Sequence, residues 1–570
     1  MQSTFFGLNV ATQGLFTARI GLDITNHNIT NSNTPGYSRQ YGVQSACRPL
    51  PNNGIGMMGT GSEILKISQY RNYYLDVKYW NNSSHLGEYS VKNDQSSYLE
   101  TMLNEVKNDG ITKHFSDVFT SLQKLAKDPN NSSCKVNFAD MATSFSRFFN
   151  DIGEKMGSFQ KDANFGVKIK VDQINNYADQ IATINEQIRN VEFAGAQAND
   201  LRDKRAKIVD KLSGIINIKA EEVVDANGKK TFSILANGQR LVYGNDVSLL
   251  ETKARKYKNN PEDEEGLFDI YWKNGDKFDI TDPNLQGELK GYIDMRDGNN
   301  NDIFKGSIEG APLASATKTI SIVNPARSDL PLKGKIKIDG VEYTYNNYSY
   351  DKVNDKATFT LDTDAPVGSK NVSMGDDLNY KGISYYVKKL NSFVRTIAKN
   401  FNDIHAKGVD ENGNTGVPLF TYKGYTPGDD VDYDKMNINN FQFSNEVKDN
   451  LDKLLTKYSS IDGESNSDLI KEIMKLRHDN NMFDKGEPDN YIQSLVGELG
   501  IDCSQSKSFH DGQVNLSKMI ENQRLSYSGV DLNEETMNII RFQQAYNISA
   551  QMIRVFDEIY DVTINRMGAS

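Results

Sequence analysis

The sequence predicts an α+β protein in which helical domains enclose a central β-rich domain. Towards both ends of the chain, apolar residues recur in alternating steps of three and four, the spacing of helices that pack along one another. From about residue 214 to residue 375 the period changes to two, with Asn-Gly and Asp-Gly pairs between β-prone runs. Because helical spacing then returns, we expect an elongated, nested multidomain protein whose two ends meet.

Length and composition restrict the class of protein. A chain of 570 residues is too long for one ordinary core, so it should form several domains. Only 37% of the residues are hydrophobic and the mean hydropathy is -0.60, which suits an elongated molecule or one that buries apolar faces against partners. The formal net charge of -11 argues against nucleic acid and anionic lipid, because both favour a basic surface. The first residues lack the basic and apolar regions of a cleavable signal peptide, and no apolar run approaches the length of a membrane span.

The first helix is predicted from a row of large apolar residues near the N-terminus. One such residue occurs at every seventh position, at Leu8, Leu15, Leu22 and Ile29. The entropy lost on ordering a helix of this length exceeds what four buried side chains return, so the helix should not be stable alone. We therefore expect it to pack on a C-terminal helix and on neighbouring copies of the chain.

A polar corner follows the first helix. Between Asn28 and Gln40 the sequence reads NITNSNTPGYSRQ. The amides of asparagines such as Asn28 and Asn31 compete with the backbone for hydrogen bonds and favour helix ends. Pro35 cannot continue a helix, and the glycine after it supplies the positive φ of a type II turn. The segment is therefore predicted to stop the helix and reverse the chain. The predicted turn consists of Thr34, Pro35, Gly36 and Tyr37.

The remaining elements follow from the same two periods. Helical spacing covers about 69–127 and a long run that ends near residue 191, and it returns at about residue 385. The predicted hairpin turns are Asn227-Gly228, Asn237-Gly238, Asn274-Gly275 and Asp339-Gly340. The last helix carries its own row, which consists of Ala545, Ile548, Met552, Val555, Ile559 and Val562. These patterns divide the chain into residues 1–62, 63–213, 214–375, 376–527 and 528–570, with a variable insert over about 314–372.

Side chains with catalytic or metal-binding chemistry are scattered along the sequence. The six histidines have no zinc-binding spacing, and the three cysteines form neither a disulfide framework nor a CxxC site. Cys503 and His510 are close in sequence, but catalytic pairs are brought together by the fold, so two unrelated residues are the better interpretation. The stretch DENGNTG begins at Asp410 like a calcium loop but lacks its glycine and its glutamate, so we predict a polar turn. We expect no enzyme, no catalytic or metal-ligating residue and no cofactor.

Four stretches of the chain resemble a known family. The stretch from Ser3 to Gln40, above all its ending TPGYSRQ, is similar to the N-terminal signature of flagellar rod, hook and hook-associated proteins. The junction protein that follows the hook has segments similar to three further stretches. These are GELKGYIDMRD from Gly287, FNDIHAKGVDENGNTGVPLF from Phe401 and SGVDLNEETMNIIRFQQAYNISAQMI from Ser528. The insert carries no such resemblance.

The resemblance implies a non-catalytic structural protein of the bacterial flagellum. It implies export by the flagellar type III pathway without a cleaved signal peptide, and an extracellular ring layer at the hook–filament junction that filament assembly needs. The implied partners are further copies of the chain, the hook protein, hook-associated protein 3 and a cytoplasmic export chaperone at the C-terminal helix. The expected assembly interface consists of Leu8, Leu15, Leu22, Ile29, Asn28, Asn31, Thr34, Pro35, Gly36, Tyr37, Gln543, Gln544, Tyr546, Ile548, Met552, Val555, Ile559 and Val562.

Two other interpretations stay open. A surface adhesin, displayed on the flagellum through the β insert, would be favoured by a large exposed aromatic patch. Tyrosines that pack across strands are the commoner explanation for such residues. The tyrosines concerned are Tyr343, Tyr345, Tyr348 and Tyr350. An enzyme domain in the insert would be signalled by a metal or protease motif, and the sequence of the insert contains neither.

Overall fold

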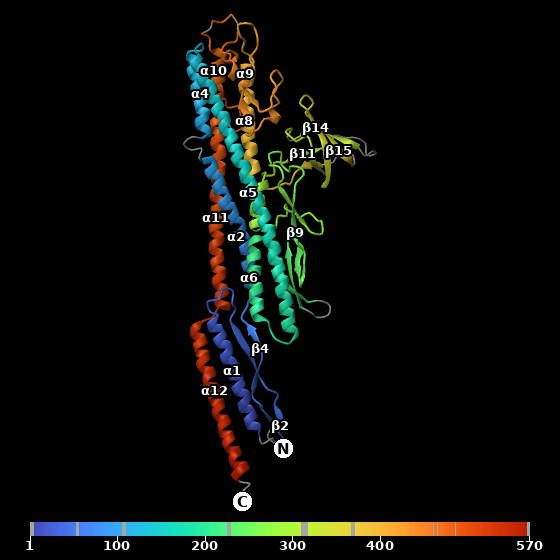
Figure 1. Ribbon diagram of the computed structural model, residues 1–570, viewed down its shortest axis with the longest axis vertical. Coiled ribbons are helices and arrows are strands. Elements are labelled where there is room, and N and C mark those ends of the chain that lie inside the picture. The colour runs from blue at the N-terminus through green and yellow to red at the C-terminus, as the bar shows by residue number, and fades with distance from the viewer. Residues whose placement is uncertain are drawn as a thin grey trace. The chain divides into compact units, whose positions relative to one another are not determined.

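The chain divides into two compact units. Figure 1 labels their helices and strands. The computed structural model describes residues 5–52, 56–104, 110–224, 230–308, 317–325, 327–365, 371–459, 461–463, 465–484 and 486–566. Unit 1 consists of Met1–Leu86, Gln173–Leu249 and Gly512–Ser570, and unit 2 consists of Gly87–Asp172 and Leu250–Asp511. Three long helices contribute residues to both units, namely α2 (Tyr73–Asn104), α5 (Ser132–Phe193) and α11 (Pro488–Ser528). The expected α+β class, with long helices near both ends and a β-rich middle, is confirmed.

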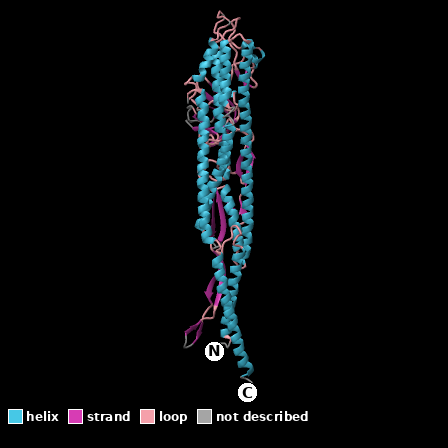
Figure 2. Ribbon diagram, turned by 90° about the vertical axis from the view of Figure 1, so that its left-hand side faces the viewer, coloured by secondary structure: helices cyan, strands magenta, loops and turns pink. Residues whose placement is uncertain are grey.

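Unit 1 contains the two terminal helices. The helices α1 (Phe6–Thr30) and α12 (Leu532–Asp561) pack on each other and lie side by side in both views (Figures 1 and 2). After α1 the N–H of Tyr37 donates to the carbonyl of Thr34 at 3.1 Å, and Gly36 has a φ of +83°. A glycine with positive φ at the third position is the signature of a type II turn. The predicted helix stop and chain reversal are therefore confirmed.

Small sheets complete unit 1. The strands β1 (Gln40–Ala46) and β4 (Ser62–Gln69) pair antiparallel, as do β2 (Leu50–Asn52) and β3 (Gly56–Met58). The helix α6 (Asn199–Ile215) leads into a four-stranded sheet of β5 (Ile218–Val224), β6 (Lys230–Ala236), β7 (Gln239–Tyr243) and β8 (Asp246–Val247). Asn237 and Gly238 have φ values of 47° and 74°, so they form the predicted hairpin turn between β6 and β7. The predicted turn at Asn227-Gly228 lies outside the described residues.

Unit 2 has a helical core rich in phenylalanine. Its own helices are α4 (Ile111–Lys127), α7 (Glu288–Asp297), α8 (Ile383–His405), α9 (Asn445–Asp449) and α10 (Asp468–Lys475). Two short sheets pair β9 (Leu250–Ala254) with β10 (Phe268–Trp272) and β17 (Phe420–Tyr422) with β18 (Phe441–Phe443). The rings of Phe145, Phe149 and Phe393 meet in the buried centre at centroid distances of 5.1 Å and 5.8 Å. No described helix combines the length and apolar character that crossing a membrane requires.

A six-stranded barrel also belongs to unit 2. Its strands are β11 (Phe304–Ser307), β12 (Thr317–Val323), β13 (Gly334–Ile338), β14 (Val341–Asp351), β15 (Lys356–Ala365) and β16 (Asn371–Met374). They follow the order β11-β16-β13-β14-β15-β12, and a bridge between Ile308 and Ile322 joins the two outer strands. Asp339 and Gly340 have φ values of 47° and 84° and form the predicted turn between β13 and β14. The barrel therefore extends past the expected insert, because β11 precedes residue 314 and pairs with β16.

The tyrosines of the barrel pack its interior and its strands. Tyr345 and Tyr348 are buried and lie against Phe359 with centroid distances of 5.1 Å and 5.0 Å. Tyr343 and Tyr350 are half-buried against the same cluster. These four residues do not form an exposed aromatic patch, which is the feature that would favour an adhesin.

Candidate functional site: the terminal helix pair and its joint

The two terminal helices meet along a row of glycines. The glycines recur every seven residues on α1 and face residues that recur every seven residues on α12. The facing pairs are Gly7 with Phe556, Gly14 with Ser549, and Gly21 with Phe542. Because the numbers rise along α1 as they fall along α12, the two helices run antiparallel. A Cβ atom at Gly21 would lie 2.6 Å from the ring of Phe542, so the backbone of α1 touches the side chains of α12 directly.

One row of α12 lies in this seam. Its members are buried or half-buried, and they follow one another along α12 in alternating steps of four and three residues. They are Glu535, Ile539, Phe542, Tyr546, Ser549, Ile553, Phe556 and Tyr560. The ring of Tyr560 also contacts Phe5 at a centroid distance of 5.0 Å. This spacing keeps one face of a helix against its neighbour over its whole length.

A second row of α12 is exposed. Its residues precede the seam positions by one, the row continues past the end of α12 to Val562, and its large apolar members are 42–61% exposed. They are Ile548, Met552, Val555, Ile559 and Val562. The row that the sequence analysis singled out on the last helix therefore does not pack on α1. Both rows have the same spacing, and only the aromatic rings of one row fit against the glycines of α1.

The other expected interface residues lie beside the seam or at the corner. Leu8, Leu15, Leu22 and Ile29 are half-buried, each one position after a glycine or after Asn28. Gln543 and Gln544 are exposed, whereas Tyr546 belongs to the seam row. The glycines recur every seven residues in the sequence and could have been recognised there, but the prediction used the leucines, which have the same spacing.

The corner is built around the buried amide of Asn28. Its Nδ2 donates to the carbonyl of Gln40 at 2.9 Å, and its Oδ1 accepts from the N–H of Gln40 at 2.9 Å and from the hydroxyl of Tyr37 at 2.7 Å. One side chain of α1 thus satisfies the backbone of the first residue of β1. Burial, together with Asp200 and Asp203, raises the pKa of Tyr37 far above its ordinary value, so this hydroxyl stays a donor. The corner is a fixed joint between α1 and β1.

The residues after the turn bind distant parts of unit 1. The backbone N–H and the hydroxyl of Ser38 both donate to Asp203 of α6 at 2.8 Å. Arg39 binds Glu535 through its Nε at 2.6 Å and Glu534 through its Nη2 at 2.8 Å. Glu535 is 1% exposed, so Arg39 supplies the charge that lets this carboxylate be buried. The N-terminal and C-terminal signatures of the sequence are therefore bound to each other.

The start of α12 is fixed from its own side as well. Asp531 caps the helix, because its Oδ1 accepts from the N–H groups of Asn533 at 2.8 Å and Glu534 at 3.3 Å. The N–H of Arg39 also donates to the carbonyl of Ser528 at 2.9 Å, just before the cap. Two carboxylates in the first turn of a helix are favoured by its dipole. The joint, the cap and the first turn of α12 form one structure.

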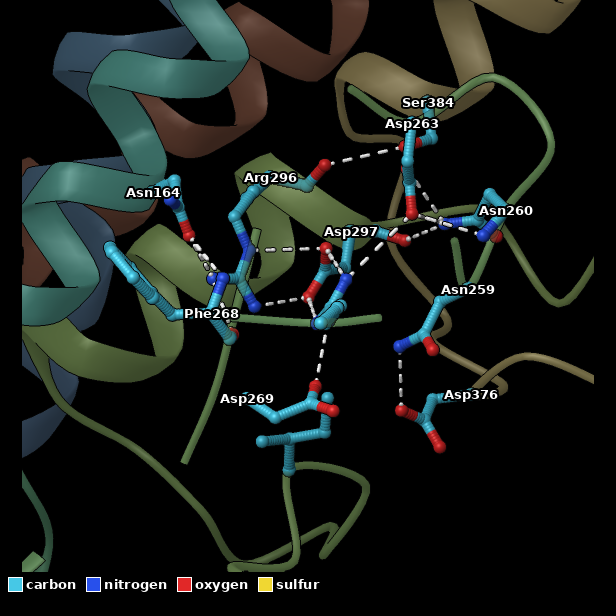
Figure 3. A network of polar contacts seen from close by, with 12 residues as sticks. Asn164, Asn259, Asn260, Asp263, Phe268, Asp269, Arg296, Asp297, Asp376 and Ser384 are labelled. Atoms are coloured by element: carbon cyan, nitrogen blue, oxygen red, sulfur yellow. Dashed lines mark hydrogen bonds and ion pairs between the residues drawn. The ribbon is translucent and has the colours of Figure 1, made fainter. Parts of the chain in front are cut away.

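A buried ionic network explains the GELKGYIDMRD stretch (Figure 3). Its Arg296 donates to Asn164 of α5 at 2.7 Å and to the carbonyl of Phe268 at 2.9 Å. Arg296 and Arg255 both bind Asp297, at 2.6 Å and 2.7 Å. Burial alone would raise the pKa of Asp297, but the two guanidinium groups hold it well below its usual range. The network ties α5, α7 and the β9–β10 region together within unit 2.

The second half of the network uses neutral donors. The hydroxyl of Ser384, in the first turn of α8, donates to Asp263 at 2.6 Å, and Gln160 of α5 donates to the same carboxylate at 3.0 Å. Burial and the nearby charge of Asp297 raise the pKa of Asp263. Every group here is engaged with a protein partner, which is typical of a structural network rather than a reaction site.

The stretch from Phe401 forms a buried loop anchor. His405 receives the N–H of Leu455 on Nε2 at 3.0 Å and faces the carbonyl of Val417 with Nδ1 at 2.6 Å, so the neutral ring protonated at Nδ1 fits both partners. Burial lowers the pKa of His405 to about 4. Asp410 accepts from the N–H groups of Asn412 and Asn414 at 2.8 Å and 2.7 Å, which confirms the predicted polar turn.

The pair Cys503 and His510 has no catalytic geometry. The thiol of Cys503 is buried and donates to the carbonyl of Ser96 at 3.1 Å, and burial raises its pKa to about 12. A thiol with so high a pKa is a poor nucleophile. His510 lies 3.3 Å from the carboxylate of the adjacent Asp511. Within the described ranges, no three His, Cys, Asp or Glu side chains are grouped as metal ligands.

Two stretches of the chain match models of flagellar protein families. Residues 521–567 match the family described as flagellar basal body rod FlgEFG protein C-terminal. Residues 96–306 match the family described as flagellar hook-associated protein FlgK helical domain. The first match covers α12 and the second covers helices of both units and the start of the barrel.

Proteins named flagellar hook-associated protein 1 match nearly the whole length of the chain. The flagellar hook-associated protein 1 of Bacillus subtilis is 25% identical over 592 residues, covering 100% of this chain and 99% of the relative. Those of Salmonella typhimurium and Escherichia coli are 24% and 25% identical, each covering 98% of this chain and 99% of the relative. The flagellar hook junction protein FlgK of Burkholderia pseudomallei covers 80% of this chain and 100% of its own, with a TM-score of 0.49 and 14% identity. The chain is therefore similar to flagellar hook-associated protein 1 along nearly its whole length, which supports a structural role in the flagellum.

Proposed function

We propose that the chain forms the junction layer between the hook and the filament of the bacterial flagellum and is needed for filament assembly. It acts by packing, without catalysing a reaction. The observation that carries this proposal is the second row of α12. One row of that helix is covered by α1, and the other, beginning at Ile548, is exposed along the helix although it is apolar. A helix with two apolar rows packs on two neighbours.

The proposal assigns the exposed row to other subunits. Copies of this chain in a ring would cover it laterally, with the hook protein below the ring and hook-associated protein 3 above it. Before export, a cytoplasmic chaperone at the C-terminal helix would shield the same row. Contiguous exposed apolar surface on a soluble subunit marks such interaction sites. The protein would reach its place outside the cell by flagellar type III export without a cleaved signal peptide.

The joint has a defined part in this function. It fixes the direction in which α1 and α12 leave the rest of unit 1, because Asn28 holds β1 and Arg39 holds the start of α12. The residues from Thr34 to Tyr37 would therefore transmit position within the assembly rather than contact a substrate. The adhesin alternative gains no support from the barrel, whose tyrosines are buried or half-buried.

The experiment replaces two exposed apolar residues of α12 in a strain that lacks the chromosomal copy. Met552→Glu with Ile559→Glu should leave the melting temperature of the purified monomer unchanged, because both side chains are exposed. The variant should be lost from the distal end of the hook, and filament subunits should appear in the medium. Labelled antibody on intact flagella and the filament count per cell measure both effects.

A matched control changes another face of the same helix. Asn547→Glu with Arg554→Glu alters exposed residues outside both rows and should preserve filaments and location. Normal filaments with the Met552 and Ile559 variant would contradict the proposal. So would a wild-type protein found anywhere other than the hook–filament junction.

A further inference from the structure

A lysine-rich cleft lies in unit 2, where the segment after β9 meets the barrel strands β13 and β14. Its lysines are Lys256, Lys258, Lys277, Lys335 and Lys337. Two carboxylates of the cleft, Glu342 and Asp376, face these lysines, while Asp269 is bound to Arg255 at 2.7 Å. Five ammonium groups thus stand against two carboxylates, on a chain whose net charge is -11.

The carboxylates that face the lysines of the cleft already form ion pairs with them. Asp376 binds Lys337 at 2.8 Å. Its other carboxylate oxygen accepts from Asn259 at 3.0 Å, as Figure 3 shows at the edge of the buried network. Glu342 binds Lys335 at 3.0 Å. In the part of the chain that the structure describes, neither Lys256 nor Lys258 has an ion-pair partner. The cleft therefore keeps unneutralised positive charge.

An acidic loop of the same unit carries the opposite charge. Asp429 and Asp430 follow the Pro427–Gly428 turn and are both exposed. Neither has an ion-pair partner among the described residues, whereas the next acids are occupied. Asp434, for example, lies 3.9 Å from Lys352. The loop is a compact pair of free carboxylates on a rigid turn.

The two patches cannot neutralise each other within one copy. Glu342 of the cleft lies at the start of β14, and Lys352, just after the end of this strand, pairs with Asp434, four residues beyond the acidic loop. Ten residues of extended strand span roughly 30 Å at about 3.3 Å per residue. Four residues of chain between Asp430 and Asp434 reach at most about 14 Å, so within one copy the acidic loop stays well beyond ion-pair distance of the cleft.

We propose that the lysine cleft of one copy binds the acidic loop of the next copy. The proposal rests on the ring layer put forward above and names the side-to-side contact within it. A contact between two different patches is heterologous, and such a contact generates a ring when its rotation closes. Charge complementarity of this kind fixes partner and orientation. The contact joins Lys256 and Lys258 to Asp429 and Asp430.

Cross-linking on intact flagella tests which surfaces meet. Lys258→Cys with Asp430→Cys, in a chain with Cys47→Ser and Cys134→Ser, should give dimers and higher products with a short bismaleimide. Cys503 remains in this chain, but it is buried and should not react with the bismaleimide, so it serves as an internal negative control. Each single-cysteine chain should give monomer only. A protein that sits at the junction and yields no cross-linked products would overturn the inference while leaving the proposed function intact.

Charge reversal gives an independent readout. Lys256→Glu with Lys258→Glu should lower the number of filament-bearing cells about tenfold, and so should Asp429→Lys with Asp430→Lys. All four changes together should restore filaments to most of the wild-type number. The control Lys318→Glu with Lys399→Glu changes two exposed lysines outside the cleft and should have no effect. Full filament numbers in both reversed variants, or four changes no better than two, would overturn the inference. Absence of the wild-type protein from the junction would overturn the proposed function and the inference with it.

Discussion

Replacing Arg39 with methionine should loosen the start of α12 without disturbing the rest of unit 1. The methionine keeps the unbranched apolar part of the side chain but removes the guanidinium group that faces Glu535 at 2.6 Å and Glu534 at 2.8 Å. Glu535 is 1% exposed, and removing one partner of a buried pair costs about 3–5 kcal/mol. The dipole at the start of α12 compensates part of this loss, which favours the lower end of the range. Glu534 is half-exposed, so its share is about 0–1 kcal/mol.

The same reasoning predicts how the second partner behaves. Glu535→Gln alone should cost about 1–2 kcal/mol, because the amide still accepts one hydrogen bond from Arg39. In the Arg39→Met chain, however, Glu535→Gln should restore about 2 kcal/mol, since it removes the unpaired buried charge. If Glu535 stabilises the wild-type chain but destabilises the Arg39→Met chain, the two residues form a charge clamp, that is, an ion pair that holds the start of α12, rather than a simple packing contact.

Amide hydrogen exchange along α12 measures this effect. A loss of about 3 kcal/mol in the local opening free energy speeds exchange on the order of 100-fold in the first turns of the helix. Arg554→Met, an exposed arginine of α12, is the matched control and should leave exchange unchanged. Equal exchange rates in the Arg39→Met and wild-type chains would refute the clamp. So would a Glu535→Gln change that fails to restore protection in the Arg39→Met chain.

Three further changes test other parts of the structure. Gly21→Val places a side chain 2.6 Å from Phe542 and should destabilise the α1–α12 pair by about 1–3 kcal/mol. Faster amide hydrogen exchange in both helices measures this effect. Unchanged exchange would mean that the two helices are not in contact at Gly21. The pKa of His405 is about 4 in the folded chain, against 6.5 in the unfolded chain. The stability that depends on the neutral, buried ring is therefore fully present above about pH 6.5. It falls as the pH drops towards 4, because the unfolded chain binds a proton that the folded chain does not. Lowering the pH from 7 to 5 should therefore cost unit 2 about 2 kcal/mol in urea unfolding, and His405→Gln should lose that part of the pH dependence. Excising residues 304–374 removes Arg327, which pairs with the buried Glu262 at 2.5 Å, so the excision is combined with Glu262→Gln. This variant should keep the helical core folded by circular dichroism, because Phe304 and Met374 pair directly and a short linker joins their neighbours. Excising only 314–372 should give an aggregating protein, since β11 would remain without a partner.

Local residue chemistry made the first helix and the joint predictable. Proline and glycine at positions 35 and 36 determine a turn almost independently of context, and the structure has that turn. The Asn-Gly and Asp-Gly hairpins are predictable for the same reason. The joint's partners were not predictable, because Asp203 and Glu535 lie far away in sequence and look like ordinary surface acids. Only the fold brings them to Ser38 and Arg39.

The seam on α12 shows a different limit of sequence reasoning. Two rows with identical spacing run along this helix, offset by one residue, as Ile548 precedes Ser549 and Val555 precedes Phe556. Periodicity cannot say which row faces α1, because both satisfy the same repeat. The choice depends on shape, since the rings of one row fill the space left by glycines on α1. A correct prediction would have required matching the glycine repeat to the aromatic repeat.

The one-residue offset between the rows also determines where a neighbour can lie. Successive residues of a helix are separated by about 100° of rotation, so the exposed row faces about 100° away from the seam with α1. A subunit packed on that row stands beside the α1–α12 pair rather than opposite α1. The clamp between Arg39 and Glu535 then has a structural role, because Glu535 belongs to the seam row. By holding that residue, the joint fixes the rotation of α12 and thereby the direction in which the exposed row points.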